Sequence, residues 1–276
     1  MFANYYSIVI HIHFHLSPQA IFILTRTYFS KRHSIYQPMT FPFSLSQASL
    51  AAAILGSVYG NYIALSPPNP SHHAAPSTGD SVRGLLLTKK HSTKVALAPW
   101  GLLALQSAAL ALHYPDIPAS VIRHGGENGL NMNLITWSPA TAIPLALIFG
   151  AGIPLRLIPY ASLGKNFTFA LRTPDRLKTT GIYQYVQHPS YTGVLILVLS
   201  NVALLSRLDG PFSCWVPPQY YNTLYWMLGL MAPCTAVFFY GTWKRVCEEE
   251  KMLKAAFGKE WENWHAKTAR FIPYIF

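Results

Sequence analysis

The sequence predicts an all-α fold: a polytopic integral membrane protein with about five transmembrane helices and a cytosolic C-terminal helix. Of the 276 residues, 51% are hydrophobic and only 11% are charged, and the mean hydropathy is +0.23, which is too apolar for an ordinary soluble domain. Several apolar runs reach the length of about 20 residues that crosses a bilayer. Lysine and arginine gather in alternate connections between these runs, as expected when one side of the protein faces the cytosol.

Five apolar runs are the predicted spans. The third and fifth contain prolines, which transmembrane helices tolerate when neighbouring groups satisfy the freed carbonyls, so kinks are expected there. The fourth is short and begins at a proline, which suits the first turn of a helix. In order, the runs cover Leu45–Leu65, Val95–His113, Leu134–Ile158, Pro189–Leu205 and Leu224–Trp243.

Basic residues orient the spans. The connection between the third and fourth spans carries Arg156, Lys165, Arg172, Arg176 and Lys178, and further basic residues lie between the first two spans and after the fifth. The two opposite connections hold only Arg123 and Arg207. The strongly basic side is therefore predicted to be cytosolic. The net charge of +11 fits loops lying against an anionic leaflet, and no nucleic-acid partner is expected.

The chain divides into an N-terminal extension, residues 1–44, and a membrane domain, residues 45–276. The extension contains an apolar run interrupted by histidines, Tyr5–Leu24, and lacks the basic start of a signal peptide. The three cysteines are scattered without a CxxC pair, so neither a metal site nor a disulfide framework is expected. The glycines of "GAG" at 150–152 lie inside an apolar span, which favours helix packing over dinucleotide binding.

Two polar segments flank the hairpin of the fourth and fifth spans. They read "SLGKNFTFALRTPDRLKTTGIYQYVQHPSYTG" and "WKRVCEEEKMLKAAFGKEWENWHAKTARFIPYIF". A short turn on the far side of the membrane returns both to the cytosolic face, so we expect them to build one site. The helix beginning at Pro189 turns its free N–H groups towards that face, and Gly181 and Gly193 permit close approach of a ligand or another backbone. From Lys244 to about 256 the second segment favours a helix on which Arg245 and Glu249, four residues apart, can form an ion pair.

Together these segments resemble a known family. The pieces "LGKNFT", "LKTTGIYQYVQHPSYTG" and "RVCEEEKMLKAAFGKEWENWHAKTARFIP" resemble the isoprenylcysteine carboxyl methyltransferases and, more distantly, the phospholipid methyltransferases. The resemblance covers roughly residues 150–276. It implies S-adenosylmethionine as cofactor, bound between the loop and the tail helix without a Rossmann domain. It implies as acceptor the prenylated C-terminal cysteine of CaaX-type proteins, in the endoplasmic reticulum membrane with the site facing the cytosol.

The resemblance also implies roles for single residues. Arg245 falls on the position that holds the acceptor's carboxylate, and so is the expected catalytic and substrate-binding residue. Gln187 stands where the family motif has an arginine, and Trp261 and Trp264 stand where tyrosines are usual. Cofactor contacts are implied for Arg172, Asp175, Arg176, Leu177, Lys178, Tyr183, His188, Pro189, Ser190, Tyr191 and Glu249.

These roles are chemically consistent. A prenylcysteine carboxylate is ionised at neutral pH, so its methylation needs positioning rather than a general base. The planar fork of Arg245 suits a carboxylate, and Glu249 can orient Arg245 or contact the cofactor's ammonium group. A phospholipid N-methyltransferase is the alternative; its acceptor amine must first lose a proton, so a base such as His188 would be needed. A non-enzymatic membrane interaction protein would have no use for the cluster at 188–191.

Overall fold

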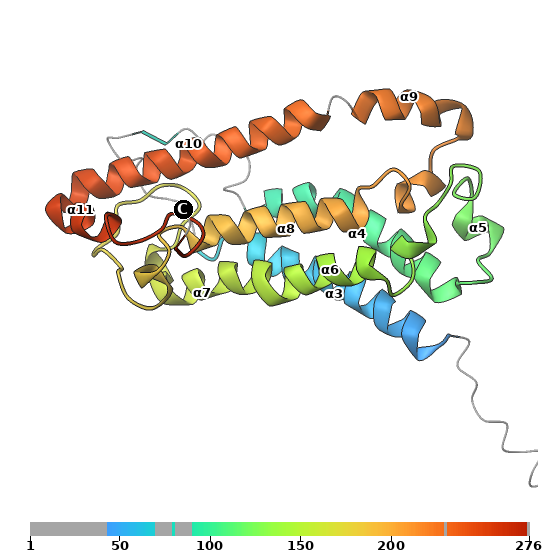
Figure 1. Ribbon diagram of the computed structural model, residues 1–276, viewed down its shortest axis with the longest axis horizontal. Helices are drawn as coiled ribbons and strands as arrows, with labels where there is room; N and C mark the ends of the chain where they lie inside the picture. The colour runs from blue at the N-terminus through green and yellow to red at the C-terminus, as the bar shows by residue number, and fades with distance from the viewer. Residues whose placement is uncertain (1–42, 70–78, 81–89, 229–230, 275–276) are drawn as a thin grey trace, which may run out of the picture. The chain divides into compact units, whose positions relative to one another are not determined.

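The computed structural model describes residues 43–69, 79–80, 90–228 and 231–274 (Figure 1). Within these ranges the chain is helical, and its only β contact is an isolated parallel bridge between Val186 and Ala269. The predicted all-α fold is confirmed. The apolar run Tyr5–Leu24 lies outside the described residues, and the division of the chain at residue 44 stays a prediction.

The described chain forms nine α-helices and five short helical turns. The helices are α3 (Leu45–Leu65), α4 (Lys90–His113), α5 (Ala119–Ile122), α6 (Pro139–Leu147), α7 (Ile153–Leu163), α8 (Pro189–Leu205), α9 (Pro218–Leu228), α10 (Met231–Phe257) and α11 (Lys259–His265). The short helical turns are η2 (Met132–Leu134), η3 (Ile148–Gly152), η4 (Gly164–Asn166), η5 (Gly181–Gln184) and η6 (Pro211–Cys214).

Three helical stretches of the described chain are long and apolar enough to cross a membrane. They are Leu45–Leu65, Thr93–His113 and Met132–Asn166, and α8 is a shorter apolar helix. The first and fourth predicted spans have the same bounds as α3 and α8. The fifth predicted span, Leu224–Trp243, overlaps the end of α9 and the first part of α10, and residues 229–230 lie outside the described ranges. Helix α10 then runs without a break into the polar tail.

The third span is longer than predicted, and Arg156 lies well inside it rather than near its end. Helices α6 and α7 follow one another through η3, a π-helical turn. Pro154, just after this turn, has no N–H to donate, and the wider turn accommodates the missing bond within a continuous helix. Assigning Arg156 to the basic connection was therefore wrong, because helix α7 continues to Leu163 and buries Arg156 at 6% exposure.

Small residues bring α7 and α8 together. A Cβ at Gly193 would lie 3.0 Å from the carbonyl oxygen of Gly152 and 3.1 Å from Cγ of Arg156. The packing role expected for "GAG" is confirmed, and Gly193 serves the approach of a backbone. Helix α3 is tied to α8 by a buried hydrogen bond of 3.0 Å from the amide of Asn61 to that of Asn201. The apolar core around this bond includes Leu50, Ile54, Ala104, Leu197 and Leu204.

Candidate functional site

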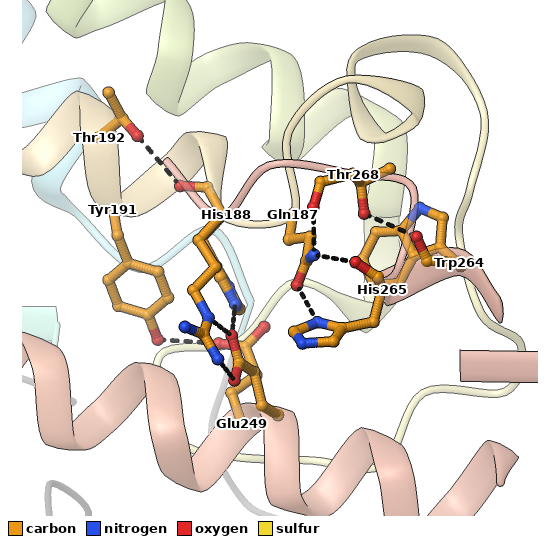
Figure 2. Close-up of polar contacts among 10 residues, drawn as sticks. Gln187, His188, Tyr191, Thr192, Glu249, Trp264, His265 and Thr268 are labelled. Atoms are coloured by element: carbon orange, nitrogen blue, oxygen red, sulfur yellow. Dashed lines mark hydrogen bonds and ion pairs between the residues drawn. The ribbon is translucent and has the colours of Figure 1, made fainter. Parts of the chain in front are cut away.

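The two polar segments meet where the start of α8 faces the C-terminal half of α10 (Figure 2). The hydroxyl of Tyr191 donates to Glu249 Oε2 at 2.9 Å. Nε2 of His188 lies 3.3 Å from Glu250 Oε1. These contacts join residues about sixty positions apart in sequence. The expectation that both segments contribute to one place is confirmed.

His188 is the N-cap residue of α8, and it is almost fully buried. Pro189 at the first helical position sets the start of the helix, and Pro189 and Ser190 are buried as well. The backbone N–H of His188 donates to the carbonyl of Arg270 at 2.9 Å. Its ring Nδ1 is buried and has no hydrogen-bond partner among the described residues. A polar ring atom in this position is suited to a bound ligand, because an unmet buried acceptor or donor is costly.

Glu250 connects His188 to the C-terminal tail. Nε and Nη2 of Arg270 donate to its two oxygens at 2.8 and 3.1 Å. Burial alone would raise the pKa of Glu250, but the hydrogen bonds from His188 and Arg270 lower it to about 2. Glu250 is therefore an ionised acceptor at neutral pH. The sequence pattern did not distinguish its role from that of Glu249.

Gln187 fastens the tail to the start of α8 (Figure 2). Its Nε2 donates to the carbonyls of His265 at 3.2 Å and Thr268 at 2.7 Å, and its Oε1 accepts from His265 Nδ1 at 2.8 Å. Its backbone N–H also donates to the carbonyl of Ala269 at 2.8 Å. An amide can donate and accept at once, whereas a guanidinium only donates. These contacts explain why a glutamine suits this position, where the family motif has an arginine.

Arg245 has a partner that the sequence did not suggest. Its Nη1 lies 2.5 Å from Asp80 Oδ1, and its Nη2 donates to the carbonyl of Phe169 at 2.5 Å. The second oxygen of Asp80 accepts the backbone N–H of Leu171 at 2.7 Å. The expected ion pair between Arg245 and Glu249 is wrong, because Glu249 points across to α8 while Asp80 reaches Arg245. A lone aspartate 165 positions away gives no local signal.

Arg156 is a second buried cation beside this cluster, and site prediction missed it. Its guanidinium hydrogen-bonds Ser190 and Tyr160, and its Nε donates to the carbonyl of Ala64 at 2.9 Å. The ring of Phe169 lies 5.1 Å from its guanidinium carbon. Its position in an apolar span was the signal that could have found it, because an ionisable residue there is functional by default.

The remaining predicted residues fall into two groups. Tyr183 is buried near the cluster; burial raises the pKa of its hydroxyl, and the charge of Glu249 raises it further. By contrast, Asp175 is exposed and pairs with Lys165 at 3.2 Å, a hydrogen bond that lowers the pKa of the carboxyl. Arg176 is also exposed, whereas Arg172, Leu177 and Lys178 are half-buried. The cofactor role of this loop stays a prediction.

Comparison with known proteins adds the family context. Residues 143–209 match the model of the isoprenylcysteine carboxyl methyltransferase (ICMT) family. A probable protein-S-isoprenylcysteine O-methyltransferase of Oryza sativa subsp. indica is 27% identical over 132 residues, which are 45% of this chain and 56% of the relative. The protein-S-isoprenylcysteine O-methyltransferase of Schizosaccharomyces pombe (strain 972 / ATCC 24843) is 31% identical over 125 residues, 44% of each chain. The resemblance drawn from the motifs is confirmed.

The extent of these matches is limited. The chain spans about half the length of the curated relatives it matches. A solved structure of a eukaryotic intramembrane Ras methyltransferase, isoprenylcysteine carboxyl methyltransferase without a monobody, aligns with 19% identity and a TM-score of 0.37. That alignment covers 100% of this chain and 90% of the solved one.

Proposed function

We propose that this protein transfers a methyl group from S-adenosylmethionine to the carboxylate of a C-terminal prenylated cysteine, giving a methyl ester. The observation that carries this proposal is the meeting of His188 and Tyr191, which lie within the segment that matches the family model, with the glutamates of α10. Its matched relatives are named for S-isoprenylcysteine, which supports the carboxylate acceptor over the phospholipid alternative. The helices that are long and apolar enough to span a membrane support a setting at a bilayer.

The residues around the start of α8 fit the cofactor. The unpartnered Nδ1 of His188 can meet one polar group of it, and the carboxylate of Glu249, oriented by Tyr191, suits its ammonium group. Bound S-adenosylmethionine supplies an electrophilic methyl group on a sulfonium. We assign further contacts to Arg172, the stretch 175–178, Tyr183, Pro189 and Ser190, as the family resemblance implies.

The acceptor carboxylate is proposed to bind at Arg245. Two of the five guanidinium N–H groups face Asp80 and Phe169, so other donors of the fork can serve a carboxylate. Because that carboxylate is ionised at neutral pH, no side chain has to remove a proton. The protein's work is to hold the carboxylate in line with the methyl group and to keep water away. A prenyl chain partitions into lipid, which explains a site at the membrane.

The setting follows from the same chemistry. We propose that the acceptors are CaaX-type proteins, that the protein resides in the endoplasmic reticulum membrane, and that the site faces the cytosol. The excess of basic residues in the loops on that side supports this orientation.

One assay tests the proposed reaction. Membranes containing the protein are supplied with S-adenosylmethionine labelled in its methyl group and with a farnesylated cysteine. We expect a labelled, base-labile methyl ester that is formed by wild type and by Arg207→Ala, an arginine in the opposite connection, but is strongly reduced in Arg245→Ala. Label in lipid amines without methyl ester would establish the phospholipid alternative instead.

A further inference from the structure

Glu250 is shared by two groups that can each donate a hydrogen bond. Arg270 takes both of its oxygens, and Nε2 of His188 approaches one of them at 3.3 Å. All three groups lie at the junction of α8, α10 and the tail, and Glu250 is only 8% exposed. In addition, the guanidinium of Arg270 lies 5.6 Å from the ring centre of Trp243 on α10. This cluster lies next to the residues assigned to the cofactor.

The chemistry of a carboxylate decides which ring nitrogen of His188 carries hydrogen. An ionised carboxylate only accepts, so Nε2 of His188 must be the protonated nitrogen that faces Glu250. In a neutral imidazole the other nitrogen, Nδ1, then presents a lone pair. The tautomer that fits this contact therefore carries its hydrogen on Nε2.

We propose that Glu250 and Arg270 hold His188 with hydrogen on Nε2, so that Nδ1 accepts a hydrogen bond from an N–H or O–H group of the bound cofactor. The inference rests on the proposed function and extends it to two residues that neither the motifs nor the comparisons assign. Glu250 and Arg270 act through His188, so they are positioning residues. The buried and unpartnered Nδ1 is the independent sign that a ligand donor belongs there.

Backbone pairing with the start of α8 fixes the position of Arg270 in the C-terminal tail. Gln187 and His188 donate their backbone N–H groups to the carbonyls of Ala269 and Arg270 in a short parallel pairing. The side chain of Gln187 fixes the residues just before that pairing through Thr268. Arg270 is thereby held where its side chain reaches Glu250. A tail shifted by one residue would turn this side chain away, because successive residues in an extended segment point to opposite sides.

Nitrogen NMR of the full-length protein tests the protonation directly. In detergent-solubilised protein labelled with ¹⁵N-histidine, the ring signals of His188 are assigned by their loss in His188→Gln. We expect the pattern of a neutral ring with hydrogen on Nε2, and we expect the Nδ1 signal to move when S-adenosylhomocysteine is added. A doubly protonated ring, or hydrogen on Nδ1, in the wild-type protein would overturn the inference without any variant having to fold.

Measurements of cofactor affinity in variants of Glu250 and Arg270 provide a second test. In Glu250→Gln the single amide oxygen is taken by Arg270, so the amide N–H₂ faces His188 and favours hydrogen on Nδ1. Leaving the ligand donor unmatched should weaken cofactor binding by about tenfold or more. The matched control is Glu262→Gln, which removes the exposed ion pair with Lys254. It should leave both the ring signals of His188 and the cofactor affinity unchanged. Arg270→Lys should retain most of the affinity, whereas Arg270→Gln should not.

The outcomes separate the inference from the function it rests on. Unchanged cofactor affinity in Glu250→Gln, with methyl transfer intact in the wild type, would refute only the positioning role. If the wild-type protein binds neither S-adenosylmethionine nor its demethylated product, the proposed function and this inference both fail.

Discussion

Replacing Asp80 with asparagine tests whether this residue orients Arg245 or competes with the acceptor for it. The side chain of Asp80 is fully buried and that of Arg245 is 7% exposed, and their atoms approach to 2.5 Å. Because Asp80 also accepts the N–H of Leu171, we interpret it as a fixed support of the guanidinium. On this view asparagine loses the charge, and its amide cannot serve both donors equally well. Arg245 should then lose its orientation.

The expected size follows from the burial of the pair. Removing the charge from a hydrogen bond between buried ionic groups costs about 2–3 kcal/mol, which corresponds to roughly 30- to 150-fold in an equilibrium constant. We therefore expect a rise of this order in KM for a farnesylated cysteine, with the affinity for S-adenosylhomocysteine nearly unchanged. Thermal unfolding in detergent should show a loss of stability in parallel.

The assay measures methyl ester formation over a range of acceptor concentrations. The matched control is Asp209→Asn, which also removes a carboxylate from an arginine, Arg207, but in the opposite connection. A lower KM in Asp80→Asn than in wild type would refute the reasoning, because it would mean that Asp80 occupies the acceptor's place on Arg245. An unchanged KM would refute it as well, because it would mean that Asp80 neither orients Arg245 for the acceptor nor competes for it.

Three further predictions concern the scaffold and the pH range. The pKa of Glu250 is lowered in the folded protein to about 2 from its ordinary value of 4.5. The stability that the ionised Glu250 contributes is therefore present above pH 4.5 and is lost as the pH falls from there towards 2. Glu250→Gln should accordingly show less acid destabilisation than wild type in thermal unfolding between pH 6 and 3. Gly193→Ala should destabilise by about 1–3 kcal/mol, whereas Gly150→Ala, with no atom within 4 Å of the added Cβ, should not; equal melting temperatures would contradict this packing argument. A double-mutant cycle on Asn61 and Asn201 should give a coupling energy of about 0.6 kcal/mol, and a value of zero would show that their bond adds no stability.

The sequence predicted the parts of the fold that local composition controls. The bounds of α8 followed from Pro189 and the apolar run after it, and the polar second half of α10 followed from the good helix formers between Lys244 and about residue 256. Gly258 adopts a φ of 52°, which glycine accepts most readily and which separates α10 from α11. The third span was predicted to end at Ile158, whereas the helical stretch continues through Pro159 to Asn166.

The pairing of side chains could not be predicted in the same way. Glu249 and Glu250 are adjacent, and only the placement of α10 against α8 decides that one meets Tyr191 and the other His188. The partner of Arg245 depends on where a distant stretch of chain crosses the site, which no periodicity records. Residue types predicted that a polar site exists, whereas the hydrogen-bond partners within it depend on tertiary packing.

The contact between Gly152 and Gly193 has a mechanical consequence for a lipid-borne acceptor. Two helices whose backbones are in contact leave no space between them. Helices α7 and α8 therefore form one rigid unit that holds Arg156 and His188 at a fixed spacing. Helix α10 contacts this unit through the long side chains of Glu249 and Glu250. Rotation about their side-chain bonds allows a small displacement of α10 while the hydrogen bonds to Tyr191 and His188 are kept. We therefore expect a prenyl chain to slide in along the seam between α8 and α10.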